Sequence, residues 1–319
     1  MTIVVSGSLA FDRLAEYSGL FADSILPEQL DLLNVCFLVD KVERVHGGTA
    51  GNIAYNLALL GESPLIVTCL GDDPDGRDYL ERLKEIGLST ANVDTAPNKA
   101  TAGAYIATDK AGRQLLFFNP GAMMVESSFD PAQLIGKPSD HLAIVSPGGF
   151  SDMKRLSKRY KELELNYIFD PGQQIPAFNS PDLLEMLDGS VMLITNDYEL
   201  ELFKKITGLS LEELFRYTSA VLTTLGERGS RLNTPRGSQH VMAVEVNKVV
   251  NPTGAGDAYR AGLLAALYHR EALITACRLG STIASFCVEA SGTQGHHFTP
   301  AQVLKRHFKV FNETPMFLG

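Results

Sequence analysis

The sequence has few cysteines, no long apolar stretch and no excess of positive charge. Its four cysteines lack the CxxC spacing or neighbouring histidines of a zinc site; they are Cys36, Cys69, Cys277 and Cys287. This pattern predicts free, buried thiols in a reducing compartment and excludes a disulfide-rich fold. The net charge is −9, without a block of lysine and arginine, so neither nucleic acid nor an anionic membrane is expected as the main partner.

No run of about 18 apolar residues is present, which excludes an apolar membrane-spanning helix. Residues 1–6 form a β-like stretch without a basic segment ahead of an apolar one, so we expect no secretion signal and a cytoplasmic protein. A chain of 319 residues that is 45% hydrophobic can bury a large core. It predicts one large α/β domain, alone or with a small appendage.

Short β-branched segments alternate with helical segments along most of the chain. Helical periodicity is present at 49–60, at 79–86 and after Asp257. The alternation predicts an α/β fold with a doubly wound, mostly parallel sheet and helices on both faces. The expected strands lie at 2–6, 64–70, 142–146, 167–170, 191–195 and 220–224.

Two segments, at 13–46 and about 99–120, interrupt this alternation with β character and no helices between. Residues 35–39 and 115–118 are apolar at consecutive positions, and strands of that kind need cover on both faces. We therefore expect these two insertions in a single domain, 1–319, to form a small β-sheet that closes over a substrate as a lid. Its other face would meet a partner subunit, which predicts a homodimer through the lid.

The most informative motif lies at residues 251–257, which read Asn-Pro-Thr-Gly-Ala-Gly-Asp and lead into an apolar helix. Gly254 and Gly256 let a ligand approach the backbone closely, and the free N–H groups at a helix start attract negative charge. Thr253 is the expected N-cap, with Asp257 in the first turn beside this phosphate cradle. An aspartate in a first turn also stabilises the helix dipole, so the motif alone leaves both roles open.

Other polar groups follow strands or precede helices, as ligand-binding groups do in open α/β sheets. Gly47 and Gly48 precede the helix that carries Asn52, whose amide can donate and accept hydrogen bonds; paired glycines can equally form only a tight turn. Asp12 follows the first strand and can accept hydrogen bonds from two vicinal hydroxyls, or cap a turn.

Two segments in the C-terminal half also follow strands. Asn196 and Glu199 have a spacing that suits a hydrated Mg²⁺ ion near phosphates, or a helix cap with an acidic partner three residues on. Thr224, Gly226 and Gly229 can bend the backbone around a nucleotide, although two glycines at this spacing carry little information alone.

The order of these segments resembles the PfkB/ribokinase family of small-molecule kinases, and the resemblance covers essentially the whole chain. It implies a Rossmann-like core with a β-lid that uses ATP and Mg²⁺ to phosphorylate a hydroxyl group. By this resemblance Asp257 is the catalytic base, and the other implied roles are an anion hole at Gly254, Ala255 and Gly256, magnesium at Asn196 and Glu199, ATP contacts at Asn196, Thr224, Gly226 and Gly229, and acceptor contacts at Asp12, Gly47, Gly48 and Asn52.

No GxxxxGK[ST] loop, His-Arg-Asp catalytic loop or GxGxxG turn is present, which disfavours a P-loop enzyme, a protein kinase and a Rossmann dehydrogenase. Phosphoryl transfer needs alignment and charge stabilisation more than covalent help, so few side chains suffice. Monovalent-cation-dependent members of the family usually carry aspartate where this chain has Asn251, which gives a cation site less negative charge here.

The acceptor is indicated by three stretches. Many sugar kinases of the family show Asp-x-Asn-x-Arg after a central strand, whereas 170–174 read Asp-Pro-Gly-Gln-Gln, which disfavours a phosphorylated sugar. Residues 259–262 and 284–294 look like the nucleoside-kinase branch. Phe117 or Phe118, with Gln114, could form a wall and a hydrogen bond for a nucleobase, or the phenylalanines could be lid core.

The sequence therefore favours a nucleoside kinase that converts a ribonucleoside, adenosine first, to its 5′-monophosphate. A free-sugar kinase such as a fructokinase or ribokinase is the alternative enzyme. A non-catalytic nucleotide sensor is the alternative outside enzymes, and the intact Asp257 and glycines argue against it.

Overall fold

The computed structural model describes residues 2–25 and 27–318, and its main sheet has nine strands in the order β13-β12-β11-β10-β9-β8-β1-β4-β5. The strands from β11 to β5 in this order pair in parallel, while β12 and β13 add an antiparallel edge. The bounds are β1 Thr2–Ser6, β4 Leu65–Gly71, β5 Val93–Ala96, β8 His141–Val145, β9 Asn166–Phe169, β10 Met192–Asn196, β11 Val221–Thr224, β12 Ser230–Thr234 and β13 Gly237–Val241.

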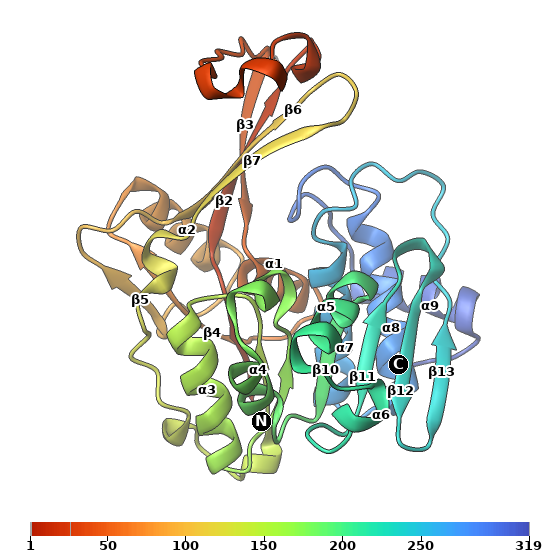
Figure 1. Ribbon diagram of the computed structural model, residues 1–319. Helices are drawn as coiled ribbons and strands as arrows, with labels where there is room; N and C mark the ends of the chain where they lie inside the picture. Colours follow the sequence, from red (N-terminus) through yellow and green to blue (C-terminus); the bar gives the residue numbers. More distant parts are fainter. Residues whose placement is uncertain (1, 26, 319) are drawn as a thin grey trace.

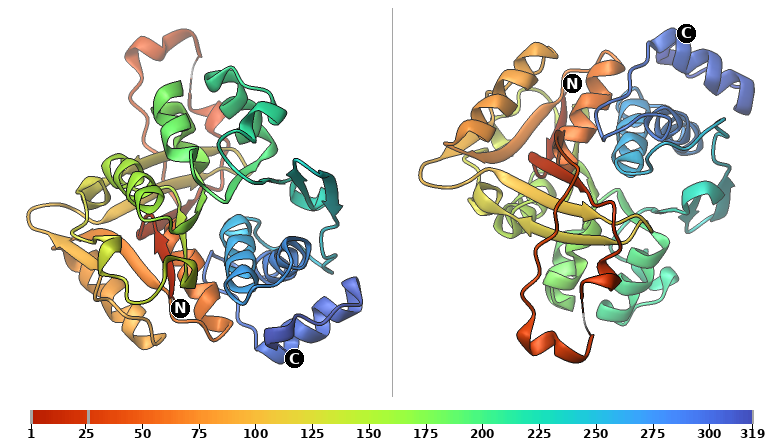
Figure 2. Two further views of the ribbon diagram at one scale, coloured as in Figure 1. Left: turned by 90° about the horizontal axis from the view of Figure 1, so that it is seen from below. Right: turned by 90° about the horizontal axis from the view of Figure 1, so that it is seen from above.

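Helices cover both faces of this sheet, and successive side chains of each strand point to opposite layers. On β1, Val5 packs with the helices α1, α2, α7, α8 and α9, whereas Val4 packs with α3 to α6 (Figure 1, Figure 2). The helix bounds are α1 Thr49–Leu59, α2 Pro74–Glu85, α3 Phe150–Glu162, α4 Ser180–Leu187, α5 Asp197–Thr207, α6 Leu211–Leu214, α7 Ala255–Tyr268, α8 Leu273–Cys287 and α9 Pro300–Phe311. The predicted doubly wound α/β fold is confirmed.

All six strands expected from the sequence are present within one residue of their predicted bounds. The helix predicted at 79–86 begins earlier, at Pro74, because the side chain of Asp73 caps it by accepting a hydrogen bond from the Gly76 N–H at 2.8 Å. No helix in the part of the chain that the structure describes is both long and apolar enough to cross a membrane.

A separate four-stranded sheet, the lid sheet, projects from the main body (Figure 1). Its order is β3-β2-β6-β7, with β2 at Ala10–Glu16, β3 at Lys41–Gly47, β6 at Ala102–Thr108 and β7 at Gln114–Asn119. The β2 and β6 strands are parallel, and the two outer pairs are antiparallel.

The expected strand at 35–39 is wrong, because these residues have no regular structure. Phe37 instead packs edge-on against the rings of Tyr17 and Phe21, at centroid distances of 5.1 and 4.9 Å. Phe37 is therefore packed against other aromatic rings, although its segment does not pair as a strand. The short 3-10 turns of the same excursion are Phe21–Asp23 and Pro27–Leu32.

Strand register divides the lid sheet into two faces. Phe118 pairs with Ala104, which pairs with Asp12, so these three side chains share one face, called here the inner face. Phe117 and Arg13 are one residue out of step and lie on the outer face.

The outer face is fastened to α2 near its base by charged side chains. Arg13 pairs with Asp75, and Arg44 pairs with Asp78 and, at 2.8 Å, with Asp75. In the same cross-strand row as Arg13, the outer face exposes Tyr105 and Phe117, which are 47% and 70% exposed, and further from the body it exposes Val42, which is 61% exposed. The outer face is thus fastened by ion pairs on β2 and β3 and carries uncovered apolar surface beside and beyond them.

Candidate active site

The turn at the start of α7 has the geometry of an anion cradle. Gly254 is the N-cap, with a left-handed φ of 84°, and its backbone carbonyl accepts from the Ala258 N–H at 2.9 Å. The expected N-cap, Thr253, is therefore wrong by one residue: no side chain caps this helix. The Gly256 N–H has no partner from within the helix, as in any α-helix start, whereas the Ala255 N–H donates to the Pro252 carbonyl at 3.2 Å.

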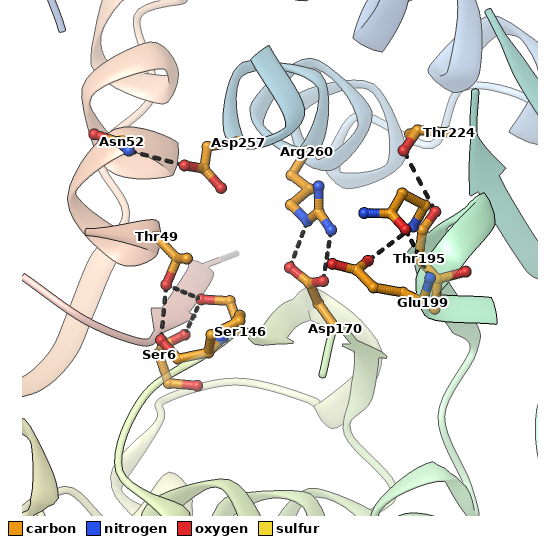
Figure 3. Close-up of polar contacts among 12 residues, drawn as sticks. Ser6, Thr49, Asn52, Ser146, Asp170, Thr195, Glu199, Thr224, Asp257 and Arg260 are labelled. Atoms are coloured by element: carbon orange, nitrogen blue, oxygen red, sulfur yellow. Dashed lines mark hydrogen bonds and ion pairs between the residues drawn. The ribbon is translucent and has the colours of Figure 1, made fainter. Parts of the chain in front are cut away.

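Asp257 lies in the first turn of α7 and faces α1. Asn52, in the first turn of α1, donates a hydrogen bond from its Nδ2 to Oδ2 of Asp257 at 2.8 Å (Figure 3). The Asp257 side chain is only partly exposed, and burial raises its pKa to about 7, against the opposing effects of Arg260 and Asn52. The structure therefore places a readily protonated carboxyl group beside the predicted cradle.

Asp12 is a second carboxylate in the same region, contributed by β2 of the lid sheet. Burial raises its pKa to about 6. A Cβ at Gly47 would lie 2.8 Å from Asp12 Oδ2, so only glycine lets the carboxylate lie over this backbone. Gly48 has a φ of 86°, and a Cβ there would lie 2.5 Å from the Ser8 carbonyl oxygen. The two glycines serve a tight turn, and that turn brings Asp12 to the start of α1.

Gln294 belongs to this cluster and was not assigned a role from the sequence. Its Nε2 donates to Oδ1 of Asn52 at 3.1 Å and to the Tyr79 hydroxyl at 3.0 Å. The Tyr79 hydroxyl in turn donates to the Gly47 carbonyl at 2.7 Å. Because Oδ1 of Asn52 is occupied as an acceptor, its Nδ2 is the group that points to Asp257. In the sequence, residues 292–294 indicated only a resemblance to the nucleoside-kinase branch and did not predict a contact for Gln294.

Hydroxyl groups anchor the start of α1 to the sheet below (Figure 3). Thr49 Oγ1 donates to the Pro147 carbonyl at 2.9 Å and accepts from Ser146 Oγ at 3.1 Å. Ser146 Oγ is also 2.6 Å from the Ser6 carbonyl oxygen at the end of β1. This network fixes the helix turn that carries Asn52.

The two lid residues proposed for the acceptor occupy different places. Phe118 is on the inner face with Asp12 and is 46% exposed, so it is available to a ligand. Gln114 shares that face but lies four residues further along β7, about 13 Å away, where it donates to Thr108 Oγ1 at 3.3 Å. The structure brings Phe118, but not Gln114, toward Asp12.

The predicted nucleotide-contacting residues follow β11. Thr224 ends this strand, and the turn after it is closed by the Leu225 N–H donating to the Gly229 carbonyl at 2.8 Å. Gly226 is exposed, and a Cβ there would meet nothing within 4 Å. At Gly229 a Cβ would lie 2.0 Å from the Val241 carbonyl oxygen, so this glycine is required by packing.

Asn196 and Glu199 form a reciprocal capping box at the start of α5. Asn196 Oδ1 accepts from the Glu199 N–H at 2.7 Å, and Glu199 Oε2 accepts from the Asn196 N–H at 2.8 Å. Burial raises the pKa of Glu199. Its second oxygen makes no hydrogen bond among the residues that the structure describes, which suits a water-mediated contact with Mg²⁺. Among the residues that the structure describes, no group of three or more side chains that could hold a metal ion is found.

A buried ion pair lies between these groups. Arg260, one turn after Asp257 on α7, donates from Nη2 to Oδ1 of Asp170 at 2.6 Å and from Nε to Oδ2 (Figure 3). Asp170 follows β9, and its side chain is only 1% exposed. Both residues lie in segments identified from the sequence, 170–174 and 259–262, but the contact between them was not predicted.

The profile of the pfkB family carbohydrate kinases matches residues 23–299. The chain belongs to this family.

A nucleoside kinase from Methanocaldococcus jannaschii is 29% identical to this family member over 273 residues, which is 86% of this chain and 89% of that protein. The structure of a Burkholderia thailandensis nucleoside kinase in complex with inosine has a TM-score of 0.87 and 34% identity, covering 98% of this chain and 99% of that one. The ADP-inosine complex of the same kinase has a TM-score of 0.84 and 35% identity, covering 98% and 97%.

The PfkB chain is thus a phosphotransferase that acts on a hydroxyl acceptor and uses a nucleotide, and the resemblance seen in the sequence is confirmed. Its ribokinase-like fold is the predicted one. The functional roles of the individual site residues stay predictions.

The raised pKa of Asp257 has a measurable effect on stability. Because the folded state binds this proton more tightly than the unfolded state, the wild-type free energy of unfolding loses this contribution as the pH rises from about 4 to about 7. The Asp257→Asn variant has no carboxyl group at this position, so its stability does not include this pH-dependent contribution. We expect the stability of the variant relative to wild type to increase across this interval and then level off, measured by urea unfolding. A pH-independent difference would contradict the raised pKa.

Proposed function

We propose that this protein is a nucleoside kinase that transfers the γ-phosphoryl group of ATP to the 5′-hydroxyl of a ribonucleoside, with adenosine as the favoured acceptor. The hydrogen bond between Asn52 and Asp257 carries the proposal, since it joins the acceptor-side helix α1 to the carboxylate at the α7 cradle. The full-length similarity to nucleoside kinases, one of them in complex with inosine, supports the acceptor class.

In the proposed reaction, Asp12 accepts hydrogen bonds from the ribose hydroxyls, and the Nδ2 of Asn52 donates one to them. The 5′-oxygen forms a bond to the γ-phosphorus while the bond from that phosphorus to the bridging oxygen breaks and ADP leaves. The hydroxyl proton passes to Asp257, which needs to be ionised beforehand. Backbone N–H groups of Ala255 and Gly256 stabilise the negative charge of the transferring group.

The nucleotide side is proposed at the turn after β11 and at the start of α5. Thr224 and Gly226 would contact ATP there, with Gly229 closing the turn. Glu199 would bind Mg²⁺ through water, and the ion would neutralise charge on the phosphates. The capping role of Asn196 keeps Glu199 in place at the start of α5.

The inner face of the lid sheet gives the nucleobase an apolar wall. Phe118 is exposed on this face, above the carboxylate that would hold the sugar, and Leu116 is 56% exposed next along it. A base has a broad, flat apolar face that such side chains can cover, whereas a free hexose or pentose offers only a small patch of C–H groups. This favours a nucleoside over a free sugar.

The acceptor class is tested by kcat/KM with ATP and a panel of adenosine, inosine, guanosine, cytidine, ribose and fructose. We expect a ribonucleoside to exceed both sugars by at least about tenfold, because burial of the base contributes more than 1.4 kcal/mol. Adenosine should be the best of the panel. A sugar that exceeds every nucleoside would replace the proposal with a free-sugar kinase, and no ADP release with any acceptor would favour a nucleotide sensor.

The role of Asp257 is tested by Asp257→Asn, which keeps the size of the side chain and removes its basicity. We expect kcat to fall about 10²- to 10⁴-fold, with a nearly unchanged fold by circular dichroism. Glu81→Gln, an exposed carboxylate on α2, is the matched control and should retain wild-type kcat. More than half of the wild-type kcat in Asp257→Asn would exclude a catalytic base at this position.

We also propose that the protein is a homodimer in which each lid sheet covers the outer face of the other. Exposed Val42, Tyr105 and Phe117 support this arrangement, because an uncovered apolar sheet face favours association. Phe117→Glu should shift the wild-type dimer to monomer in sedimentation velocity at micromolar concentration. Ile135→Glu, at a 93% exposed apolar side chain outside the lid, should leave the dimer intact. A soluble wild-type monomer would refute the proposed dimer.

A further inference from the structure

The ion pair of Arg260 with Asp170 is unusual in its burial. Both side chains are almost fully buried, at 9% and 1% exposure, and the guanidinium donates through two nitrogens to the two carboxylate oxygens. Burying two charges costs several kcal/mol per ion, and well-packed apolar residues often replace such pairs without loss of stability. A contribution to stability therefore does not account for this pair.

The third guanidinium nitrogen lies against the phosphate cradle. A Cβ built on Gly256 would be 2.9 Å from Nη1 of Arg260, so the guanidinium occupies the space beside this residue of the turn. A side chain at residue 256 would displace it. The absence of a Cβ at Gly256 thus lets Arg260 approach the backbone of the turn closely.

Acidic groups surround this guanidinium. Asp170 binds it, while Asp257 and Glu199 both interact with its charge. Two like charges, those of Asp170 and Asp12, also act on Asp257. The other groups that face it are Asn52 from α1, Tyr79 from α2 and Cys287 from α8. Among these groups Arg260 is the source of positive charge, at the position where a triphosphate and an ionised base would both have to be accommodated.

We propose that Arg260, clamped by Asp170, is a positioning residue for phosphoryl transfer: it packs against the 254–257 turn at Gly256 and supplies the positive charge that the surrounding carboxyl groups lack. The inference rests on the proposed role of Asp257. Arg260 does not touch the reacting atoms; it acts through the turn and through Asp257. Lysine cannot replace it, because one ammonium group cannot bond both Asp170 oxygens in the same planar geometry and also reach Gly256.

The test compares pH profiles of kcat for wild type, Arg260→Lys, Arg260→Met and Asp170→Asn, with whichever acceptor the wild type phosphorylates. Activity should rise with pH as Asp257 ionises. Loss of the Arg260 charge should move this rise upward by about one pH unit and lower kcat at pH 7 about 10- to 100-fold. KM for the acceptor should stay within about threefold, because the proposed acceptor contacts are on β2 and α1.

Asp170→Asn removes a like charge that raises the pKa of Asp257, while Arg260 keeps its own charge, so the rise should move downward, opposite to the Arg260 variants. Because Arg260 loses its clamp, kcat should still fall. Arg155→Met is the matched control: Arg155 pairs at 2.7 Å with Asp152, which is 8% exposed and lies on α3. This control should leave the pH profile unchanged. The double variant Asp170→Asn/Arg260→Met removes both buried charges, and we expect it to fold if Arg260→Met alone does not. Its upward shift should be smaller than that of Arg260→Met, because loss of Asp170 lowers the pKa of Asp257 and offsets part of the effect of losing Arg260.

An unshifted pH profile in every folded Arg260 variant, or a fall in kcat equal at all pH values, would overturn the inference. Asp257→Asn separates this outcome from failure of the proposed function. If Asp257→Asn abolishes the pH dependence while the Arg260 variants keep the wild-type profile, the base is correct and the positioning role is wrong. If Asp257→Asn retains activity, the proposed function itself fails.

Discussion

The arrangement of the site depends on placing a carboxylate where two helix starts meet. Asp257 lies in the first turn of α7, Asn52 lies in the first turn of α1, and the hydrogen bond between them joins the two turns. A carboxylate this enclosed is costly to ionise, and the effect is visible in its raised pKa. Two nearby groups reduce that cost, the amide of Asn52 oriented by Gln294 and the guanidinium of Arg260 held by Asp170, whereas the charges of Asp170 and Asp12 add to it. The sheet and the hydroxyl network at Thr49 hold these groups in position.

Much of this fold could be read from the sequence, because strand alternation, buried β-branched segments and helix stops are local signals. The six central strands, from β1 to β11, were predicted within one residue. The edge strands β5 and β13 and the strand β12 next to β13 were missed. Only one residue of β5 and one of β13 is buried, and β12 is mostly polar, so none of them carries a clear core pattern. The segment at 35–39 failed for the opposite reason. It is apolar, but its phenylalanine is satisfied by the rings of Tyr17 and Phe21 rather than by strand neighbours.

Within the site, motifs located single residues but not their contacts. Asp257, Asn52 and Asp12 were each identified, whereas the Asp170–Arg260 pair was not, because 90 residues separate its members and only the packing of α7 against the sheet brings them together. Several glycines proved to be required by backbone geometry, as Gly229 is at the Val241 carbonyl. Gln114 shows a further limit: two residues on the same face of a strand can be too far apart to share a ligand.

The course of β2 affects how the site distinguishes a ribose acceptor from a water molecule. This strand leaves the body with a buried Phe11 and continues into the projecting sheet, so Asp12 stands at the root of the lid while Asn52 and Asp257 stand on the body. A ribose can span both parts, because its hydroxyl groups lie several bonds apart. A water molecule has one oxygen and cannot bridge the same gap. If Asp12 holds the sugar as proposed, ATP bound without an acceptor therefore meets an incomplete set of contacts, and the geometry protects it from wasteful hydrolysis.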